Sequence, residues 1–227
     1  YYQIRGPADA GSLFDFFRAS RADTTLPFQD TTPLNELNLS TANDTNLTVS
    51  ADGLFAVFAS DRADDAGVAD LYKSGRASAN DPFGTPSMII ALGVADPLAT
   101  PFLTVDGKEL WFSAIADGGQ SQTTYVAPLV DGGFKPATAR PDIEGWSAVL
   151  SDDKLTAYYA AGVNSATNAI RVAHRTGALE PFPPGSLVNE VNAGGDTPSW
   201  LSPDGCRLYF TTRRNTIAQI FVAERAP

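Results

Sequence analysis

The stretch Trp200-Leu-Ser-Pro-Asp-Gly-Cys-Arg-Leu-Tyr-Phe210 decides the fold of this chain. An Asp-Gly pair between two short apolar runs predicts two β-strands joined by a tight turn. The same pattern occurs three more times, and every copy ends on an aromatic residue. The further copies are 48–58, 102–112 and 149–159.

The closing aromatic residues recur about every 50 positions, at Phe58, Phe112, Tyr159 and Phe210. Tyr2 lies one further interval before Phe58, so it marks a fifth copy that lacks its opening strand. A polar loop and a third strand follow each aromatic, at 14–21, 70–76, 124–128, 170–175 and 220–225. A weaker fourth strand follows in four copies, near Phe28, Phe83, Phe134 and Phe182.

A period of about 50 residues with four short strands per unit is typical of a β-propeller, in which each unit forms one radial blade. We therefore predict an all-β fold, a five-bladed β-propeller of four-stranded antiparallel blades, as a single domain over 1–227. The first copy lacks its inner strand and the last lacks its outer strand. The repeats are about 1–47, 48–101, 102–148, 149–199 and 200–227.

The N-terminus is Tyr1, with no initiator methionine and no signal-peptide pattern, so we expect a processed or truncated product. Six blades are the alternative count if a copy has been lost from the chain.

Three segments carry a resemblance to a known family. The core at 202–210, with Ala59-Ser-Asp-Arg62 after the aromatic and Ala69-Asp-Leu-Tyr72 opening the next strand, resembles the WD-like repeat of the TolB propeller family. The copy at 149–159 departs from it, with Asp153-Lys154 in place of Asp-Gly. The family includes non-enzymatic periplasmic binding proteins and propeller domains attached to serine peptidases. The resemblance thus implies a repeat protein that is periplasmic or extracellular.

Composition narrows the range of partners. The chain has 227 residues, of which 43% are hydrophobic and 19% charged, and its net charge is −10. Phosphate backbones and anionic lipids would be repelled, so we expect no nucleic-acid partner. No apolar run approaches the roughly 20 residues of a membrane helix, so we expect no membrane insertion. One cysteine and one histidine allow neither an internal disulfide nor a zinc cluster.

Candidate binding residues lie in the loops between second and third strands and in the connections between blades, which leave a propeller on the same face. These loops mix charges of both signs with one large aromatic, which suits a polar ligand, a peptide, a protein or a glycan. Arg62 and Arg213 could instead pair with acids of the blades, and the equivalent Asp44 and Asp196 could cap turns. The candidates are Trp146, Arg62, Arg213, Asp44, Glu144 and Asp196.

Two further alternatives remain open. Asp61, Asp64 and Asp65 offer carboxylates for calcium, although their spacing is not that of an EF-hand, and otherwise we expect no cofactor. We predict a non-catalytic binding module that recognises its ligand at the loop face. No Gly-x-Ser-x-Gly motif occurs, so we do not expect the peptidase part of such propeller enzymes. The alternative is a carbohydrate-active hydrolase or lyase that uses carboxylates at the loop face. The predicted inner strands contain no acid, at 46–50, 101–104, 148–151 and 198–202.

Overall fold

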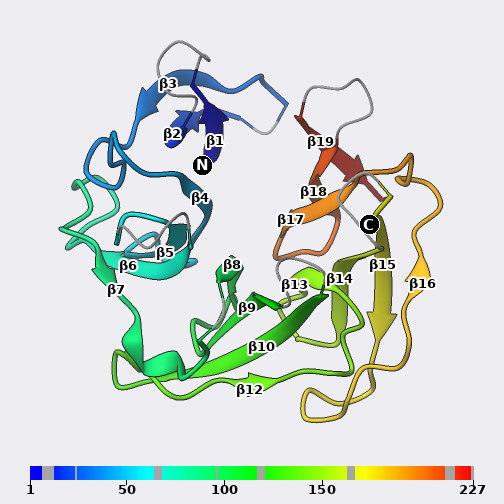
Figure 1. The fold of residues 1–227 in the computed structure, drawn as a ribbon. Coiled ribbons are helices and arrows are strands. Elements are labelled where there is room, and N and C mark those ends of the chain that lie inside the picture. Colours follow the sequence, from blue (N-terminus) through cyan, green and yellow to red (C-terminus); the bar gives the residue numbers. More distant parts are fainter. Residues whose placement is uncertain are drawn as a thin grey trace. The chain divides into compact units, whose positions relative to one another are not determined.

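The structure, a computed structural model, describes residues 1–6, 13–23, 25–63, 68–95, 97–116, 121–162, 167–212 and 218–225. Its strands form five small antiparallel sheets, and its one assigned helix in the described residues is the 3-10 turn η2 (Ile90–Leu92). The sheets follow one another along the sequence, in the order of the repeats (Figure 1). The predicted all-β class and five-bladed β-propeller are confirmed.

The first two sheets come from the N-terminal part of the chain. The first has the order β1-β2-β3, with β1 (Tyr2–Arg5), β2 (Phe14–Ser20) and β3 (Gln29–Pro33). The second has the order β4-β5-β6-β7, with β4 (Asp44–Val49), β5 (Phe55–Ser60), β6 (Asp70–Gly75) and β7 (Ser87–Met88). The outer strand of the first repeat, β3, begins at Gln29, directly after the predicted landmark Phe28.

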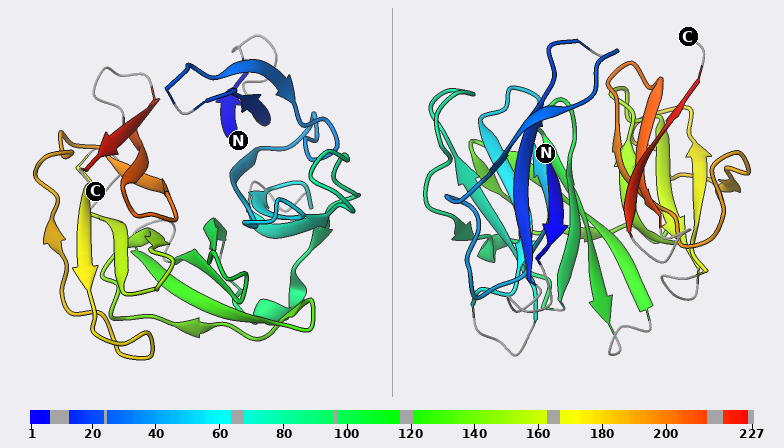
Figure 2. Two further views of the ribbon diagram at one scale, coloured as in Figure 1. Left: turned by 180° about the vertical axis from the view of Figure 1, so that it is seen from behind. Right: turned by 90° about the horizontal axis from the view of Figure 1, so that it is seen from above.

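The remaining three sheets continue the pattern (Figure 2). The third contains β8 (Leu98–Leu103), β9 (Glu109–Ala116), β10 (Ser121–Val130), β11 (Gly133–Phe134) and β12 (Thr138–Ala139), because two short strands pair along the long β10. The fourth contains β13 (Trp146–Leu150), β14 (Thr156–Ala161), β15 (Ala169–His174) and β16 (Ser186–Leu187). The fifth contains β17 (Thr197–Leu201), β18 (Arg207–Thr212) and β19 (Gln219–Glu224).

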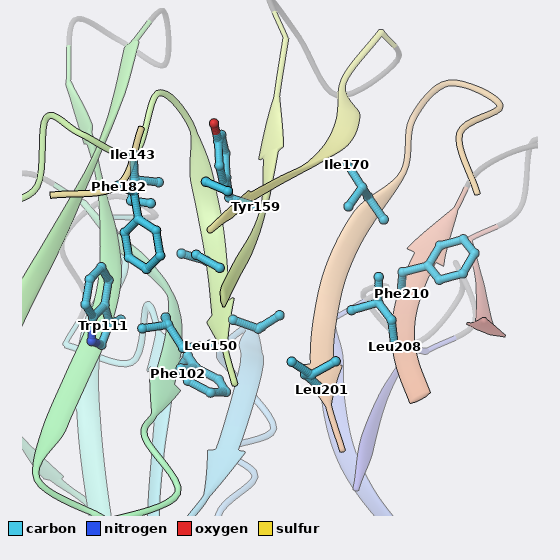
Figure 3. Close-up of a cluster of buried hydrophobic side chains, with 14 of the residues drawn as sticks. Phe102, Trp111, Ile143, Leu150, Tyr159, Ile170, Phe182, Leu201, Leu208 and Phe210 are labelled. Atoms are coloured by element: carbon cyan, nitrogen blue, oxygen red, sulfur yellow. The ribbon is translucent and has the colours of Figure 1, made fainter. Parts of the chain in front are cut away.

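The chain divides into two compact units, each with its own core. Unit 1 comprises Tyr1–Ile90 and Pro97–Pro101, and unit 2 comprises Ala91–Asp96 and Phe102–Pro227. In unit 1 the rings of Phe16 and Phe58 meet edge to face, with their centroids 5.3 Å apart. In unit 2 the core contains Trp111, Tyr159, Phe182 and Phe210, which come from consecutive repeats (Figure 3). Closing aromatics of the repeats thus contribute to both cores.

The repeated turn has one hydrogen-bond pattern. A Ser or Thr hydroxyl donates to the aspartate two positions later, at 2.5 to 2.6 Å, in Ser50–Asp52, Thr104–Asp106, Ser151–Asp153 and Ser202–Asp204. The residue after the aspartate adopts a left-handed conformation, with φ of 74° at Gly53 and 59° at Lys154. Glycine tolerates this conformation best, which explains the Asp-Gly signal. Lys154 keeps the same turn despite its side chain.

The inner strands begin earlier than predicted and contain bulges. β4 begins at Asp44 and β13 at Trp146, so both residues belong to strands rather than to loops. The prediction that inner strands contain no acid was therefore wrong at Asp44. The pairing register shifts between Thr45 and Thr48 and between Trp146 and Val149, because a bulge inserts an extra residue there.

Candidate functional site

Asp44 and Arg62 form a buried ion pair inside unit 1. The Arg62 Nη2 lies 2.5 Å from the Asp44 Oδ1, and Asp44 has no exposed side-chain surface. The other Asp44 oxygen accepts the Leu39 N–H at 2.7 Å. Arg62 also donates to the Leu37 carbonyl at 2.6 Å and to the Ser60 hydroxyl at 2.9 Å. These contacts fix the 37–44 connection to β5, as the alternative of pairing with blade acids expects.

Asp61 has a comparable local role. Its two carboxylate oxygens accept the Asn43 backbone N–H at 2.6 Å and the Asn43 side-chain amide at 2.8 Å. Asp64 and Asp65 lie outside the described residues. Among the residues that the structure describes, no group of three His, Cys, Asp or Glu side chains is arranged to hold a metal ion. A calcium site at this loop therefore stays a prediction.

Asp196 occupies in unit 2 the repeat position that Asp44 occupies in unit 1. It is fully buried, and its Oδ2 accepts the Ala193 N–H at 2.6 Å. The Asn168 side-chain amide donates to the Asp196 carbonyl at 2.7 Å. Both aspartates thus bind backbone N–H groups of the preceding connection, which fits the turn-capping alternative. Arg213 lies outside the described residues.

Two candidates at the start of the fourth sheet, Glu144 and Trp146, keep solvent-exposed surface. Trp146 is half-buried at the start of β13, and Glu144, two positions earlier, is exposed. Between them, a Cβ on Gly145 would overlap the Ala160 carbonyl oxygen and approach the Tyr159 ring to 2.7 Å. Only glycine therefore lets the backbone pass this close to β14. Trp146 has no counterpart at its position in the other repeats, and it directly follows this constrained glycine.

Ser147 holds the backbone next to Trp146. It is buried and left-handed, with φ of 55°. Its N–H donates to the Ser113 hydroxyl of β9 at 3.2 Å, and its hydroxyl donates to the Pro198 carbonyl of β17 at 3.0 Å. One residue thus links three neighbouring sheets of unit 2. The equivalent bulge residue of β4, Asn46, has nearly the same conformation, with φ of 57°, so the conformation belongs to the repeated bulge.

Glu144 also acts electrostatically on its surroundings. Burial raises the pKa of the Tyr159 hydroxyl above its usual value, and the negative charge of Glu144 adds to the rise. The Gly185 N–H and the positive charge of Arg171 act on this pKa in the opposite direction. The Tyr159 hydroxyl accepts the Gly185 N–H at 3.1 Å. Glu144 is the group at this position whose charge remains accessible to a ligand.

Sequence reasoning missed a second feature, a pocket of about 410 Å³ in unit 1. Two arginines contribute to its lining, Arg18 from β2 and Arg76 after β6. The repeat alignment contained one signal, because Arg18 stands where the other copies carry Lys73, Val126, Val172 and Val222. The lining residues include Tyr1, Arg18, Asp52, Gly53, Arg76 and Asn80.

Comparison with known proteins identifies relatives by structure alone. No family model and no curated protein matches the sequence. Among solved structures, a putative TolB from Agrobacterium tumefaciens matches with a TM-score of 0.53 and 17% identity, covering 86% of this chain and 62% of that one. A chain of a nidogen/laminin complex matches with a TM-score of 0.56 and 13% identity, covering 92% and 70%.

TolB from Acinetobacter baumannii matches with a TM-score of 0.49 and 17% identity, covering 86% of this chain. This chain spans 62% and 43% of the length of the two TolB chains. Identities this low show similarity of fold only. Among the residues that the structure describes, no helix is long and apolar enough to cross a membrane. The structural likeness therefore confirms, for the fold, the resemblance of this chain to the TolB-type β-propeller.

Proposed function

We propose that this chain is a non-catalytic binding module that recognises a polar ligand or peptide through Trp146 and Glu144. The observation that carries the proposal is a half-buried indole two positions after an exposed carboxylate, on a backbone that Ser147 ties to the sheets on either side. Rigid presentation lowers the entropy lost on binding, so a ligand gains more from each contact. Aromatic side chains held in this way dominate binding energy at interfaces.

The chemistry of the two side chains narrows the ligand class. The face of an indole attracts cations as well as apolar groups, and a nearby carboxylate adds a charge-assisted hydrogen bond. The net charge of −10 favours the approach of cationic partners. A peptide that carries Arg or Lys satisfies all three conditions better than an anionic glycan. The TolB resemblance supports a periplasmic or extracellular location for this binding.

The alternative of a carbohydrate-active hydrolase or lyase is less well supported. Such catalysis requires two carboxylates that reach the substrate, at separations of about 5 to 9.5 Å. Asp44 and Asp196 are fully buried, and each has an oxygen engaged by a backbone N–H. In this proposal they stabilise the connections before the inner strands, as does Arg62. Calcium, if it binds, would belong to the loop of Asp61, Asp64 and Asp65.

A peptide titration tests the proposal. The probes are blocked tripeptides Gly-X-Gly with X as Arg, Lys, Glu or Leu, and binding is followed by calorimetry. We expect the Arg and Lys probes to bind best and Trp146→Ala to weaken them about 30-fold, the effect of losing about 2 kcal/mol at an aromatic anchor. Trp200→Ala is the matched control, because Trp200 is 45% exposed in the same unit. Equal affinities for both variants would contradict the assignment to Trp146.

A further inference from the structure

Asp131 and Gly132 form the tip of the hairpin that joins β10 to β11 in the third sheet. Val130 pairs with Gly133, so the turn between the two strands has only two residues. Both have positive φ, 51° at Asp131 and 73° at Gly132, as a two-residue hairpin turn of this kind requires. Both residues are also exposed. The hairpin tip therefore presents to water an aspartate that is followed by an unhindered glycine.

Three other Asp-Gly pairs lie in the repeated turns of the blades, and there hydrogen bonds hold the aspartate carboxylate. One carboxylate oxygen of Asp52 accepts the Ser50 hydroxyl at 2.6 Å and the Leu54 N–H at 3.0 Å. The same two kinds of contact recur at Asp106 and Asp204. The Ser50 hydroxyl and the Leu54 N–H lower the pKa of Asp52, and the equivalent contacts lower the pKa of Asp204. These carboxylates are therefore both oriented and kept charged.

The glycine nitrogen is held in the same three turns. Its N–H donates to the carbonyl of the Ser or Thr three positions earlier, at 2.7 to 2.8 Å, in Gly53, Gly107 and Gly205. The hairpin tip has neither restraint. Among the residues that the structure describes, none forms a hydrogen bond with the Asp131 carboxylate or with the Gly132 N–H. Asp131 and Gly132 thus differ from the other three pairs at both the carboxyl group and the nitrogen.

These two groups react with each other when an Asp-Gly pair isomerises. The glycine nitrogen forms a bond to the Cγ of the protonated carboxyl group, and the amide proton leaves with the carboxyl hydroxyl as water. Water then opens the cyclic imide by breaking the bond between the nitrogen and the backbone carbonyl carbon of the aspartate. The glycine is now linked through Cγ, and the product is isoaspartate of unchanged mass. Hydrogen bonds that fix either group oppose the first step, whereas a glycine without Cβ leaves the approach open.

We propose that Asp131 is a site of spontaneous isomerisation to isoaspartate, and that the hydrogen-bonded Asp-Gly turns of the blades resist the same reaction. The product has one extra atom in the main chain at the hairpin tip, because the Cβ of the aspartate becomes part of the backbone. Such a turn no longer matches the pairing of Val130 with Gly133. Isomerisation would therefore release β11 together with Phe134, whose side chain is buried in the structure.

Peptide mapping of the aged 227-residue protein tests the proposal. The protein is incubated at physiological temperature and mildly acidic pH, and isoaspartate is located by chromatography and mass spectrometry of its proteolytic peptides. We expect isoaspartate to form at Asp131 about tenfold faster than at Asp52, Asp106 and Asp204, the effect on the barrier of about one hydrogen bond to a charged group. A further pair, Asp117-Gly118, lies outside the described residues and is mapped separately.

Ser50→Ala is the matched variant, because it removes the hydroxyl that holds the Asp52 carboxylate. It should raise the rate at Asp52 and leave the rate at Asp131 unchanged; an unchanged rate at Asp52 would contradict protection by the hydroxyl. The Lys135 amide, which donates to the Pro128 carbonyl at 2.9 Å, should exchange its hydrogen faster as isoaspartate accumulates.

A denatured sample separates the effect of structure from that of neighbouring sequence. In denaturant all four Asp-Gly sites should react at similar rates, because the hydrogen bonds of the turns are lost. A preference for Asp131 that persists in denaturant would come from local sequence and would overturn the proposal. Equal rates at the four sites in the folded protein would overturn it as well.

Discussion

Removing Arg62 should destabilise unit 1 strongly, because it would leave the Asp44 carboxylate buried without its counterion. The Arg62 side chain is 13% exposed and that of Asp44 is fully buried, so water screens the pair little. Breaking a buried pair from one side costs about 3 to 5 kcal/mol. We expect Arg62→Met to lower the free energy of unfolding by about 3 kcal/mol, the lower end of this range. Met retains some packing against Phe58 and Tyr72, whose ring centroids lie 4.9 and 5.0 Å from the Arg62 Cζ.

The assay combines thermal unfolding with hydrogen exchange. For a chain of this length about 3 kcal/mol corresponds to a fall in Tm of roughly 6 to 12 °C. The Leu39 amide, which donates to Asp44 at 2.7 Å, should exchange faster in Arg62→Met if the charged carboxylate reorients toward water. Arg207→Met is the control, because its pair with Glu224 is solvent-exposed and contributes little to stability.

The double variant Arg62→Met with Asp44→Asn provides the decisive comparison. The asparagine amide oxygen would still accept the Leu39 N–H but would carry no charge, so the double variant should be more stable than Arg62→Met alone. Strong coupling of this kind is expected for residues in direct contact. The reasoning would be refuted if Arg62→Met cost less than about 1 kcal/mol or if the two substitutions added.

Three further predictions concern unit 2. Gly145→Ala should lower the free energy of unfolding by more than about 3 kcal/mol, because its Cβ would overlap the Ala160 carbonyl oxygen. Gly107→Ala has open space around its Cβ and should cost only about 1 kcal/mol, from the strain of its left-handed backbone. Chemical denaturation of both variants measures the difference. Lys154→Gly removes a left-handed lysine together with its ion pairs. Salt screens those pairs in the parent protein, so the Tm of the variant minus the Tm of the parent should rise between about 20 mM and 1 M salt. A Tm difference that does not change with salt would contradict this prediction. Burial alone would raise the pKa of Asp142, but hydrogen bonds from a guanidinium and a backbone N–H outweigh burial and lower that pKa. The charged Asp142 therefore stabilises the fold above the unfolded pKa of about 3.9, and this stabilisation is lost as the pH falls through the folded pKa. Asp142→Asn should flatten the acid side of a plot of unfolding free energy against pH.

The prediction of the fold from sequence succeeded because the repeated element is local. A hydroxyl, an aspartate and a residue that tolerates a left-handed conformation lie within four positions, so Ser202, Asp204 and Gly205 build their turn from neighbouring atoms. Recurrence of this turn about every 50 residues then fixed the blade count. Among the described residues, the first and the last sheet have three strands each.

The site was predicted less completely. Asp44, Arg62 and Asp196 were candidates because charges on loops suggest function, yet the structure buries their contacts within the sheets and connections. Whether a carboxylate faces a ligand or a backbone N–H depends on where a strand begins, and the strands β4 and β13, which contain bulges, both begin two residues before the predicted start. A local sequence pattern does not indicate a bulge, because the bulge arises from pairing with another strand.

The sequence by itself determined the repeat, its strands and turns, the five blades and the acidic character of the chain, because each depends on neighbouring residues or on composition. The tertiary structure decided the rest: that Ser147 ties the backbone next to Trp146 to the neighbouring sheets, that Asp44 pairs with Arg62 inside unit 1, and that Arg18 and Arg76 line one pocket. Arg18 and Arg76 come from different repeats, and they meet only because consecutive sheets of unit 1 pack face to face. Burial and charge pairing arise from that packing, which no single repeat contains.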